Sequence, residues 1–258
     1  MSIKSAAERY FERPRTQARN TTLARLAAHP GLCLVGAPLA ALRRRLLASL
    51  LIQQILEQQD SGNGVEHEFS IYANESPELL IADIAAIDRG IDLSSLSLYG
   101  RYWSNSGPKS LEDSPHLSLF CDQAEIQSTA QRILWKDGAI NLGMIASAST
   151  IDKRNCLVVI ENLELLETRP NDLPLELAKL RNTAASRGIT IYAGVSTVPG
   201  ALNSVVNQPP IHPANALPDA LRPIFAIAGQ MISIEPGMES CQVTKVDLMA
   251  DKPLQAHL

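Results

Sequence analysis

Short apolar runs alternate with longer amphipathic stretches along the chain. The first run, at residues 31–35, is wholly apolar and is bounded by proline on both sides. Such a run is typical of a strand buried on both faces of a parallel sheet. A stretch rich in Leu, Ala, Arg and Gln follows over 39–59, and a Gly-rich turn ends it at 61–64. Strand, tight loop and long helix together predict the first half of a βαβ unit.

The same alternation continues towards the C-terminus. It predicts further strands at 68–72, 156–160 and 189–195, a helix beginning at Ser76-Pro77, and a helix over 173–187 that stops at Gly188. Two late apolar segments, 231–234 and 241–248, are joined through Pro236-Gly237 and predict a closing hairpin. The chain is therefore predicted to have an α/β fold, with a mostly parallel, twisted sheet flanked by helices.

Other parts of the chain are less regular. Residues 97–120 mix Ser, Gly, Pro and aromatic residues, which predicts a long loop or small insertion, and a helix is expected over 122–134. An irregular connection then leads to the strand at 156, and the prolines between 209 and 218 predict an extended loop. We divide the chain into an Arg-rich N-terminal arm, 1–28, with one or two short helices, and a domain, 29–258.

Composition narrows the class of protein. The chain has 258 residues, of which 45% are apolar, and a formal charge of −4, which argues against a surface that is basic all round and binds nucleic acid everywhere. The four cysteines are scattered without metal-ligand spacing, so we expect no metal site, no disulfide framework and no cofactor, and instead buried free thiols. We find neither a signal peptide nor a membrane-spanning run, and we expect a soluble, cytoplasmic protein. The cysteines are Cys33, Cys121, Cys156 and Cys241.

The junction between the first strand and its helix is where a P-loop would bind phosphate, because backbone N–H groups converge there. Gly36-Ala37-Pro38 opens the G-x-x-x-x-G-K-S/T pattern, but the second half of the pattern is lost. Ala41 replaces the flexible glycine, Leu42 replaces the lysine that neutralises phosphate, and Arg43 replaces the hydroxyl that binds Mg²⁺. This degenerate P-loop lacks what ordinary ATP hydrolysis requires.

Two further features bear on the same site. Arg43, Arg44 and Arg45 either contact phosphate from the helix or form a solvated basic face. Glu161 directly follows the apolar run 156–160, where P-loop ATPases place the acidic Walker B residue near Mg²⁺. A carboxylate at the end of a strand is also common as a solvated group or as a helix cap, so both interpretations of Glu161 stay open.

Taken in order, these segments resemble the RecA-like core of the DnaB-type replicative helicases. The segment 31–45 resembles the Walker A strand and loop, and 69–96 resembles the second strand, its turn and the next helix. The segment 157–166 resembles the Walker B strand, and 175–197 resembles the helix and strand that follow it. The similarity covers about 30–253, with closing strands over 218–253, and it implies a RecA-like, P-loop-type fold that assembles into oligomers.

The departures from this family fall on catalytic positions. The acidic residue that activates water in the family corresponds to Asn74, with Glu75 one place away, and an Asn cannot act as a general base. The family's sensor glutamine corresponds to Thr197, beside Ser196. The resemblance therefore implies a pseudo-ATPase with no catalytic residues, in which Asn74, Glu75 and Glu161 are degenerate catalytic-acid and Walker B positions.

Three functions remain open. The first is a catalytically inactive RecA/DnaB-like protein that acts as a partner, loader or regulator of a replicative helicase or a related DNA-processing assembly. The second is an ATPase with unusual phosphate contacts that uses Arg43 or Arg44 and Glu161. The third is a DNA-binding module, in which arginines bind phosphate and Tyr99, Tyr102 or Trp103 stack on bases. The candidate DNA or partner contacts are Arg9, Arg13, Arg15, Arg19, Arg44 and Arg45.

Overall fold

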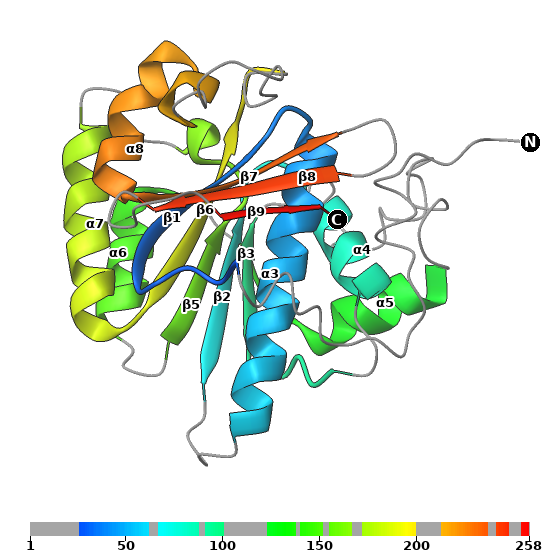
Figure 1. The fold of residues 1–258 in the computed structure, drawn as a ribbon. Helices are drawn as coiled ribbons and strands as arrows, with labels where there is room; N and C mark the ends of the chain where they lie inside the picture. Colours follow the sequence, from blue (N-terminus) through cyan, green and yellow to red (C-terminus); the bar gives the residue numbers. More distant parts are fainter. Residues whose placement is uncertain are drawn as a thin grey trace, which may run out of the picture.

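A central sheet organises the protein (Figure 1). The computed structural model describes residues 26–61, 67–87, 91–100, 123–137, 140–151, 155–166, 172–199, 213–236, 241–247 and 254–257. Within these residues nine strands form one sheet in the order β4-β3-β2-β5-β6-β1-β7-β8-β9. The strands are β1 (Gly31–Ala37), β2 (Glu68–Ala73), β3 (Leu96–Gly100), β4 (Leu134–Asp137), β5 (Asn155–Ile160), β6 (Thr190–Ser196), β7 (Gln230–Pro236), β8 (Cys241–Asp247) and β9 (Leu254–His257).

Strand direction agrees with the predicted α/β class. The neighbours from β4 to β7 all pair in parallel, and β7–β8 and β8–β9 pair antiparallel. The mostly parallel sheet and the closing hairpin of β7 and β8 are therefore confirmed. Because parallel strands need crossover connections, each apolar run is followed by a helix that returns the chain to the starting edge of the sheet.

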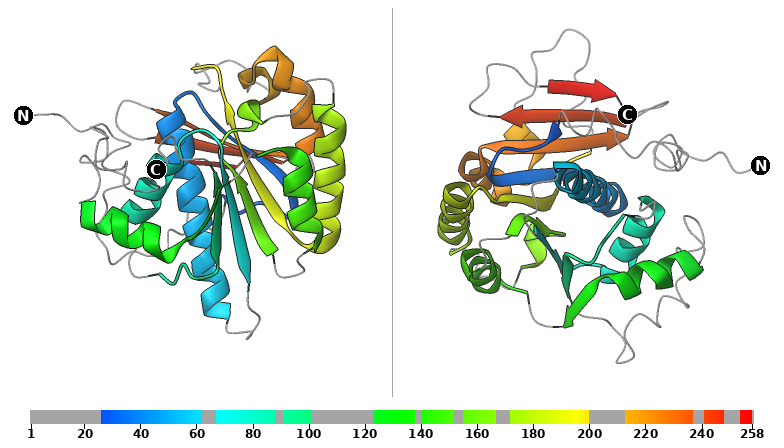
Figure 2. Two further views of the ribbon diagram at one scale, coloured as in Figure 1. Left: turned by 180° about the vertical axis from the view of Figure 1, so that it is seen from behind. Right: turned by 90° about the horizontal axis from the view of Figure 1, so that it is seen from below.

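Helices cover both faces of the sheet (Figure 2). One face packs against α3 (Ala40–Ser61), α4 (Pro77–Ile87) and α5 (Gln123–Arg132), and the other against α6 (Leu142–Ile151), α7 (Leu173–Arg187) and α8 (Arg222–Ala228). Side chains of β1 alternate between the two cores, since Cys33 and Val35 lie with α3 while Leu32 and Leu34 lie on the α7 side. Burial on both faces explains why this strand has no polar positions.

The α7 helix shows how local sequence sets an element's limits. Leu177, Leu180 and Ala184 are buried and form the stripe that packs on the sheet. Gly188 ends the helix with φ 73°, a left-handed conformation that favours glycine, and its N–H donates to the carbonyl of Ala184. The predicted helix and its stop are therefore confirmed.

Several elements differ from the sequence prediction. Part of the stretch predicted as a loop, 97–120, belongs to β3, whose Leu96 and Leu98 are buried while Ser97 and Tyr99 are half-buried. The connection expected to be irregular before residue 156 contains β4 and α6, and α8 was not predicted. These elements are short, and α6 is rich in Gly, Ser and Thr, so intrinsic propensity does not reveal them and packing on the sheet decides their structure.

The chain enters the sheet through a firmly held segment just before β1. Leu26 is buried, and the N–H of Ala28 donates to the hydroxyl of Tyr192 at 3.0 Å. The backbone N–H of His29 donates to Gln230, and Lys245 Nζ donates to a backbone carbonyl of the same segment. The predicted N-terminal arm lies mostly outside the described residues, but its attachment point at the amino end of β1 is fixed.

Two further expectations concern the whole chain. Cys33 and Cys241 are free and buried, as expected, and burial raises the pKa of the Cys33 thiol to about 12. Cys121 and the side chain of Cys156 lie outside the described part. Among the described helices, none combines the length and the apolar character needed to cross a membrane.

A pair of leucines in α7 tests the packing of this helix on the sheet. Leu177 is fully buried, so Leu177→Ala is expected to lower the free energy of unfolding by about 2–5 kcal/mol through lost contacts and a cavity. Leu175, which lies two residues away and is 60% exposed, provides the control. Leu175→Ala should change the free energy of unfolding by no more than about 0.5 kcal/mol. Urea unfolding measures both, and equal effects would contradict the assigned face.

Candidate functional site

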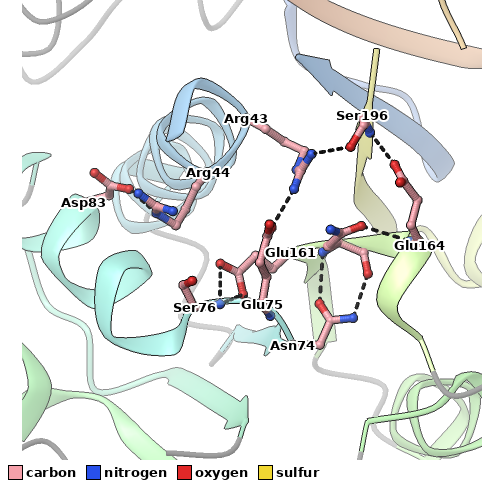
Figure 3. Close-up of polar contacts among 10 residues, drawn as sticks. Arg43, Arg44, Asn74, Glu75, Ser76, Asp83, Glu161, Glu164 and Ser196 are labelled. Atoms are coloured by element: carbon pink, nitrogen blue, oxygen red, sulfur yellow. Dashed lines mark hydrogen bonds and ion pairs between the residues drawn. The ribbon is translucent and has the colours of Figure 1, made fainter. Parts of the chain in front are cut away.

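The candidate site lies where the parallel strands end. The carboxyl ends of β1, β2, β5 and β6 share one edge of the sheet, and the connections after them carry most of the residues singled out from the sequence (Figure 3). In open α/β sheets this is the edge at which ligands bind. We call it the carboxyl edge.

The predicted P-loop is not a loop in this protein. Strand β1 extends to Ala37 and helix α3 begins at Ala40, so only Pro38 and Leu39 connect them. Gly36 therefore lies inside a strand, whereas the predicted second glycine position is already in the first helical turn. A connection of two residues is too short to wrap around a phosphate group.

The orientation of α3 changes which residue faces the site. Leu42, at the lysine position of the motif, is 5% exposed and packs in the hydrophobic core. Arg43 points instead across the carboxyl edge and is 2% exposed. Its guanidinium donates to the carboxylate of Glu75 at 2.5 Å and to the hydroxyl of Ser196 at 3.1 Å. One side chain therefore joins α3 to the segments that follow β2 and β6.

Gly194 in β6 makes room for this arginine. A Cβ added to Gly194 would lie 3.0 Å from Cδ of Arg43 and 2.0 Å from the backbone oxygen of Glu161. The backbone oxygen cannot move without shifting β5, so a side chain is excluded at this position. Neither Gly194 nor its link to the arginine was identified from the sequence.

Glu161 is buried, and its carboxylate holds the turn before α4. It accepts hydrogen bonds from the backbone N–H groups of Glu75 and Ser76 at 2.9–3.1 Å. The carbonyl of Ser76 accepts the first helical hydrogen bond of α4, so the expected cap position of Ser76 is confirmed. Among the interpretations left open for Glu161, the geometry matches a helix cap supplied from the end of a distant strand, and solvation is wrong because the residue is 0% exposed. The Walker B role near a metal ion stays a prediction.

Burial raises the pKa of Glu161 to about 7. The two backbone N–H donors and the charge of Arg44 oppose this rise, because they favour the ionised form, while the charge of Glu75 adds to it. Desolvation is the largest effect, so the carboxyl group changes its charge near neutral pH.

Asn74 and Glu75 have different roles in the structure. The amide of Asn74 forms two hydrogen bonds with the backbone of Asn162, at 2.6 and 3.0 Å, and so joins β2 to β5. Glu75, one residue later, directs its carboxylate to Arg43. Thr197 is buried, and the neighbouring Ser196 carries the polar contacts, since its N–H donates to the carboxylate of Glu164 at 2.6 Å.

Arg44 and Arg45 are not the solvated basic face that the sequence allowed, nor are they exposed to DNA. They are 9% and 7% exposed, and both donate to the carboxylate of Asp83 in α4, at 2.6 and 3.1 Å. Asp83 was missed in the sequence, although a signal existed, because it is the only charged residue in the apolar stretch 79–87. A lone carboxylate in such a helix requires a buried partner.

The remaining candidates lie elsewhere. Tyr99 stacks on Tyr72 with ring centroids 4.7 Å apart, and Lys136 lies over the Tyr99 ring, so this aromatic group is already engaged within the sheet. Tyr102, Trp103 and the N-terminal arginines 9, 13, 15 and 19 fall outside the described residues. In the described segments, no group of three or more His, Cys, Asp or Glu side chains is arranged to hold a metal ion.

These residues do not fit a magnesium–nucleotide complex. The strand–helix connection is too short, the lysine position faces the core, and the guanidinium of Arg43 spans the carboxyl edge. The acidic group after β5 directs both oxygens to backbone N–H groups. Arg43 is instead paired with Glu75, and Arg44 and Arg45 are paired with Asp83.

The pH dependence of stability tests the environment of Glu161. Its pKa is higher in the folded state than its ordinary value of 4.5, so the folded protein binds an extra proton between about pH 4.5 and 7. Raising the pH through this window should lower the free energy of unfolding by up to about 1.4 kcal/mol per pH unit. Glu161→Gln should remove this component, which urea unfolding at pH 5, 6, 7 and 8 would reveal. If the free energy of unfolding depends on pH in the same way in the wild-type protein and in Glu161→Gln, the raised pKa of Glu161 is contradicted.

A double-mutant cycle tests the ion pair of Arg43. Arg43→Met leaves the Glu75 carboxylate, which is 25% exposed, without its partner and should lower the free energy of unfolding by about 2–3 kcal/mol. In Arg43→Met/Glu75→Gln the loss should be at least about 1 kcal/mol smaller than the sum of the single losses. The surface pair of Lys179 and Glu176 provides the control, with less than about 0.5 kcal/mol for Lys179→Met. Additive effects at Arg43 and Glu75 would show that the pair is not coupled.

Comparison with known proteins identifies the fold. No protein-family model and no curated protein sequence matches the chain. Among solved structures, one ATPase domain superimposes with a TM-score of 0.56 at 10% identity, over 92% of this chain and 85% of that one. The RadB recombinase does so with a TM-score of 0.52 at 12% identity, over 93% of each chain.

A third similar structure is a DnaB-like replicative helicase, described together with its interactions with primase. It superimposes with a TM-score of 0.50 at 10% identity, over 89% of this chain and 56% of the helicase. At these identities the similarity concerns the fold alone, and the first of the three structures is an ATPase domain. The resemblance noted in the sequence is therefore confirmed at the level of architecture, and the chain has a RecA-like fold that is similar to those of a DnaB-like helicase and a recombinase.

Proposed function

We propose that this chain is a catalytically inactive RecA/DnaB-like protein that acts by binding, as a partner, loader or regulator in DNA replication or a related DNA-processing assembly. The observation that supports it best is the contact of Arg43 with Glu75 and Ser196. These groups lie where a nucleotide-hydrolysing relative needs an open, positively charged phosphate site and a free carboxylate.

The ATPase alternative requires groups that are engaged in this structure. Arg43 and Arg44 would have to bind phosphate, but their guanidinium groups are buried and hydrogen-bonded to carboxylates. Glu75 stands one residue after the expected position of the catalytic acid, and its carboxylate accepts a hydrogen bond from the guanidinium of Arg43, not from a water molecule positioned for attack. Nucleotide binding would require breaking several buried contacts at once.

The similar structures support the biological setting of this proposal. One is a DnaB-like replicative helicase described with its interactions with primase, and another is a recombinase. A fold shared with such proteins suits a protein partner from a replication or recombination assembly, or a second copy of this chain, with DNA as a further contact. Such a role would place the protein in the cytoplasm.

Titration with a fluorescent ATP analogue and Mg²⁺ tests the proposal. The protein is expected to show no saturable binding below about 1 mM, and no phosphate release above background. Leu42→Lys should not restore either property, because this position faces the core, and the buried ammonium group should lower stability instead. Arg43→Lys is the second variant, since it restores a lysine on the side of the helix that does face the site.

One result of the titration would overturn the proposal. Saturable binding by the wild-type protein that is lost in Arg43→Met would identify the arginine as a phosphate ligand and favour the ATPase. An unrelated active ATPase, assayed in parallel, controls for the sensitivity of the measurement.

A further inference from the structure

The carboxyl edge carries an exposed apolar row. Leu39, Leu165 and Val198 are 55%, 52% and 47% exposed, although large aliphatic side chains usually lie inside a protein. They follow β1, β5 and β6, which are neighbours in the sheet in the order β5-β6-β1. Three exposed side chains therefore lie on three adjacent connections at one edge.

Hydrogen bonds hold these connections together. The N–H of Thr197 donates to the carbonyl of Ala37 at 3.1 Å, which joins the connection after β6 to the end of β1. The contact between Ser196 and Glu164 joins it to the segment after β5. At a strand spacing of about 4.8 Å, the row is roughly 10 Å wide. With its exposed neighbours we call it the carboxyl-edge patch, which consists of Leu39, Ala40, Ala41, Leu165, Val198 and Pro199.

The charges beside the patch are negative. Glu164 is exposed beside Leu165, and its carboxylate accepts a hydrogen bond from the backbone N–H of Ser196, whereas the partly exposed Glu75 is already paired with Arg43. The first 25 residues of the chain have the opposite character. They hold six of the 23 Lys and Arg residues and two of the 27 Asp and Glu residues, which gives this segment a formal charge of +4 and the rest of the chain −8.

The same segment has apolar side chains and sufficient reach. Tyr10 and Phe11 provide two adjacent aromatic residues. The segment starts from Leu26, which is buried at the amino end of β1, and this strand of seven residues spans about 23 Å. The 14 residues 12–25 span up to about 46 Å when extended, so the two aromatic side chains can reach the opposite edge. Attachment to the same chain gives an effective concentration of about 1 mM or more for this contact.

We propose that residues 1–25 of this chain dock on its own carboxyl-edge patch, with Tyr10 and Phe11 on the apolar row and arginines facing Glu164. The inference rests on the proposed function, because the patch occupies the place where an active relative would hold nucleotide. A protein partner that uses this edge must first displace the segment, so partner binding is regulated by the chain itself.

Hydrogen exchange of the full chain, followed by mass spectrometry without nucleotide, tests this docking. The amides of Ala40 and Ala41 are suitable probes, because they begin α3 and have no acceptor within the helix. In the wild-type protein these two amides should exchange slowly, because residues 1–25 cover the carboxyl-edge patch. Tyr10→Ser/Phe11→Ser should accelerate their exchange by about tenfold or more, and Arg9→Glu/Arg13→Glu/Arg15→Glu should act in the same direction.

Matched variants separate docking from a general change in stability. Leu165→Ser/Val198→Ser should also accelerate exchange at Ala40 and Ala41. Leu134→Ser alters a leucine of similar exposure, 56%, at the amino end of β4 and should leave the exchange at Ala40 and Ala41 unchanged. A synthetic peptide of residues 1–25, added in excess to Tyr10→Ser/Phe11→Ser, should restore the slow exchange.

Three results would overturn the docking. They are equal exchange in the wild-type protein and the arm variants, equal effects of the patch and control leucines, and protection that grows with protein concentration, which would assign the patch to a second copy. None of them depends on ATP. Nucleotide titration tests the proposed function, and hydrogen exchange tests the docking of residues 1–25. Each proposal can therefore be rejected without the other.

Discussion

The buried guanidinium group of Arg43 is the contact on which the carboxyl edge depends. Parallel strands end together there, and their last carbonyl groups and the N-termini of the following helices bring unpaired polar groups to one place. In an enzyme of this fold type a ligand satisfies many of them. Here a side chain of the protein does so, by bridging the carboxylate after β2 and the hydroxyl at the end of β6.

A second layer of contacts supports this arrangement from both sides. Arg44 and Arg45 hold α4 against α3 through Asp83, and Glu161 holds the first turn of α4 from β5. Each group is buried, and each charge has an opposite charge or a hydrogen-bond donor beside it. Such clusters contribute little net stability relative to apolar packing, but they penalise any other arrangement, because each separated partner would remain desolvated. The cluster therefore specifies the geometry of the edge more than it strengthens the fold.

The sequence predicted the elements that are buried on both faces. The strands β1, β5 and β6 and helix α7 follow from apolar runs and one stripe, whereas β3, β4 and α6 are short or rich in small and polar residues and depend on tertiary packing. Motif spacing pointed to the connections at which the polar contacts of Arg43, Glu75 and Glu161 gather. It did not show that Leu42 turns inward while Arg43 turns to the site, because the phase of α3 is set by its packing between the sheet and α4. Pairing between distant residues, such as Arg44 with Asp83, is likewise invisible in a single sequence.

The absence of a side chain at Gly194 couples distant parts of the carboxyl edge. Any side chain there would meet the backbone oxygen of Glu161 at 2.0 Å, and the Cδ of Arg43 at 3.0 Å. Glycine is therefore required by the close approach of β6 to the residue after β5, whether or not Arg43 spans the edge. Because the carboxylate of that same Glu161 holds the backbone N–H groups of Glu75 and Ser76, a larger residue at Gly194 would also disturb the first turn of α4. A substitution in one strand would thus change the shape of a helix with which it has no direct contact.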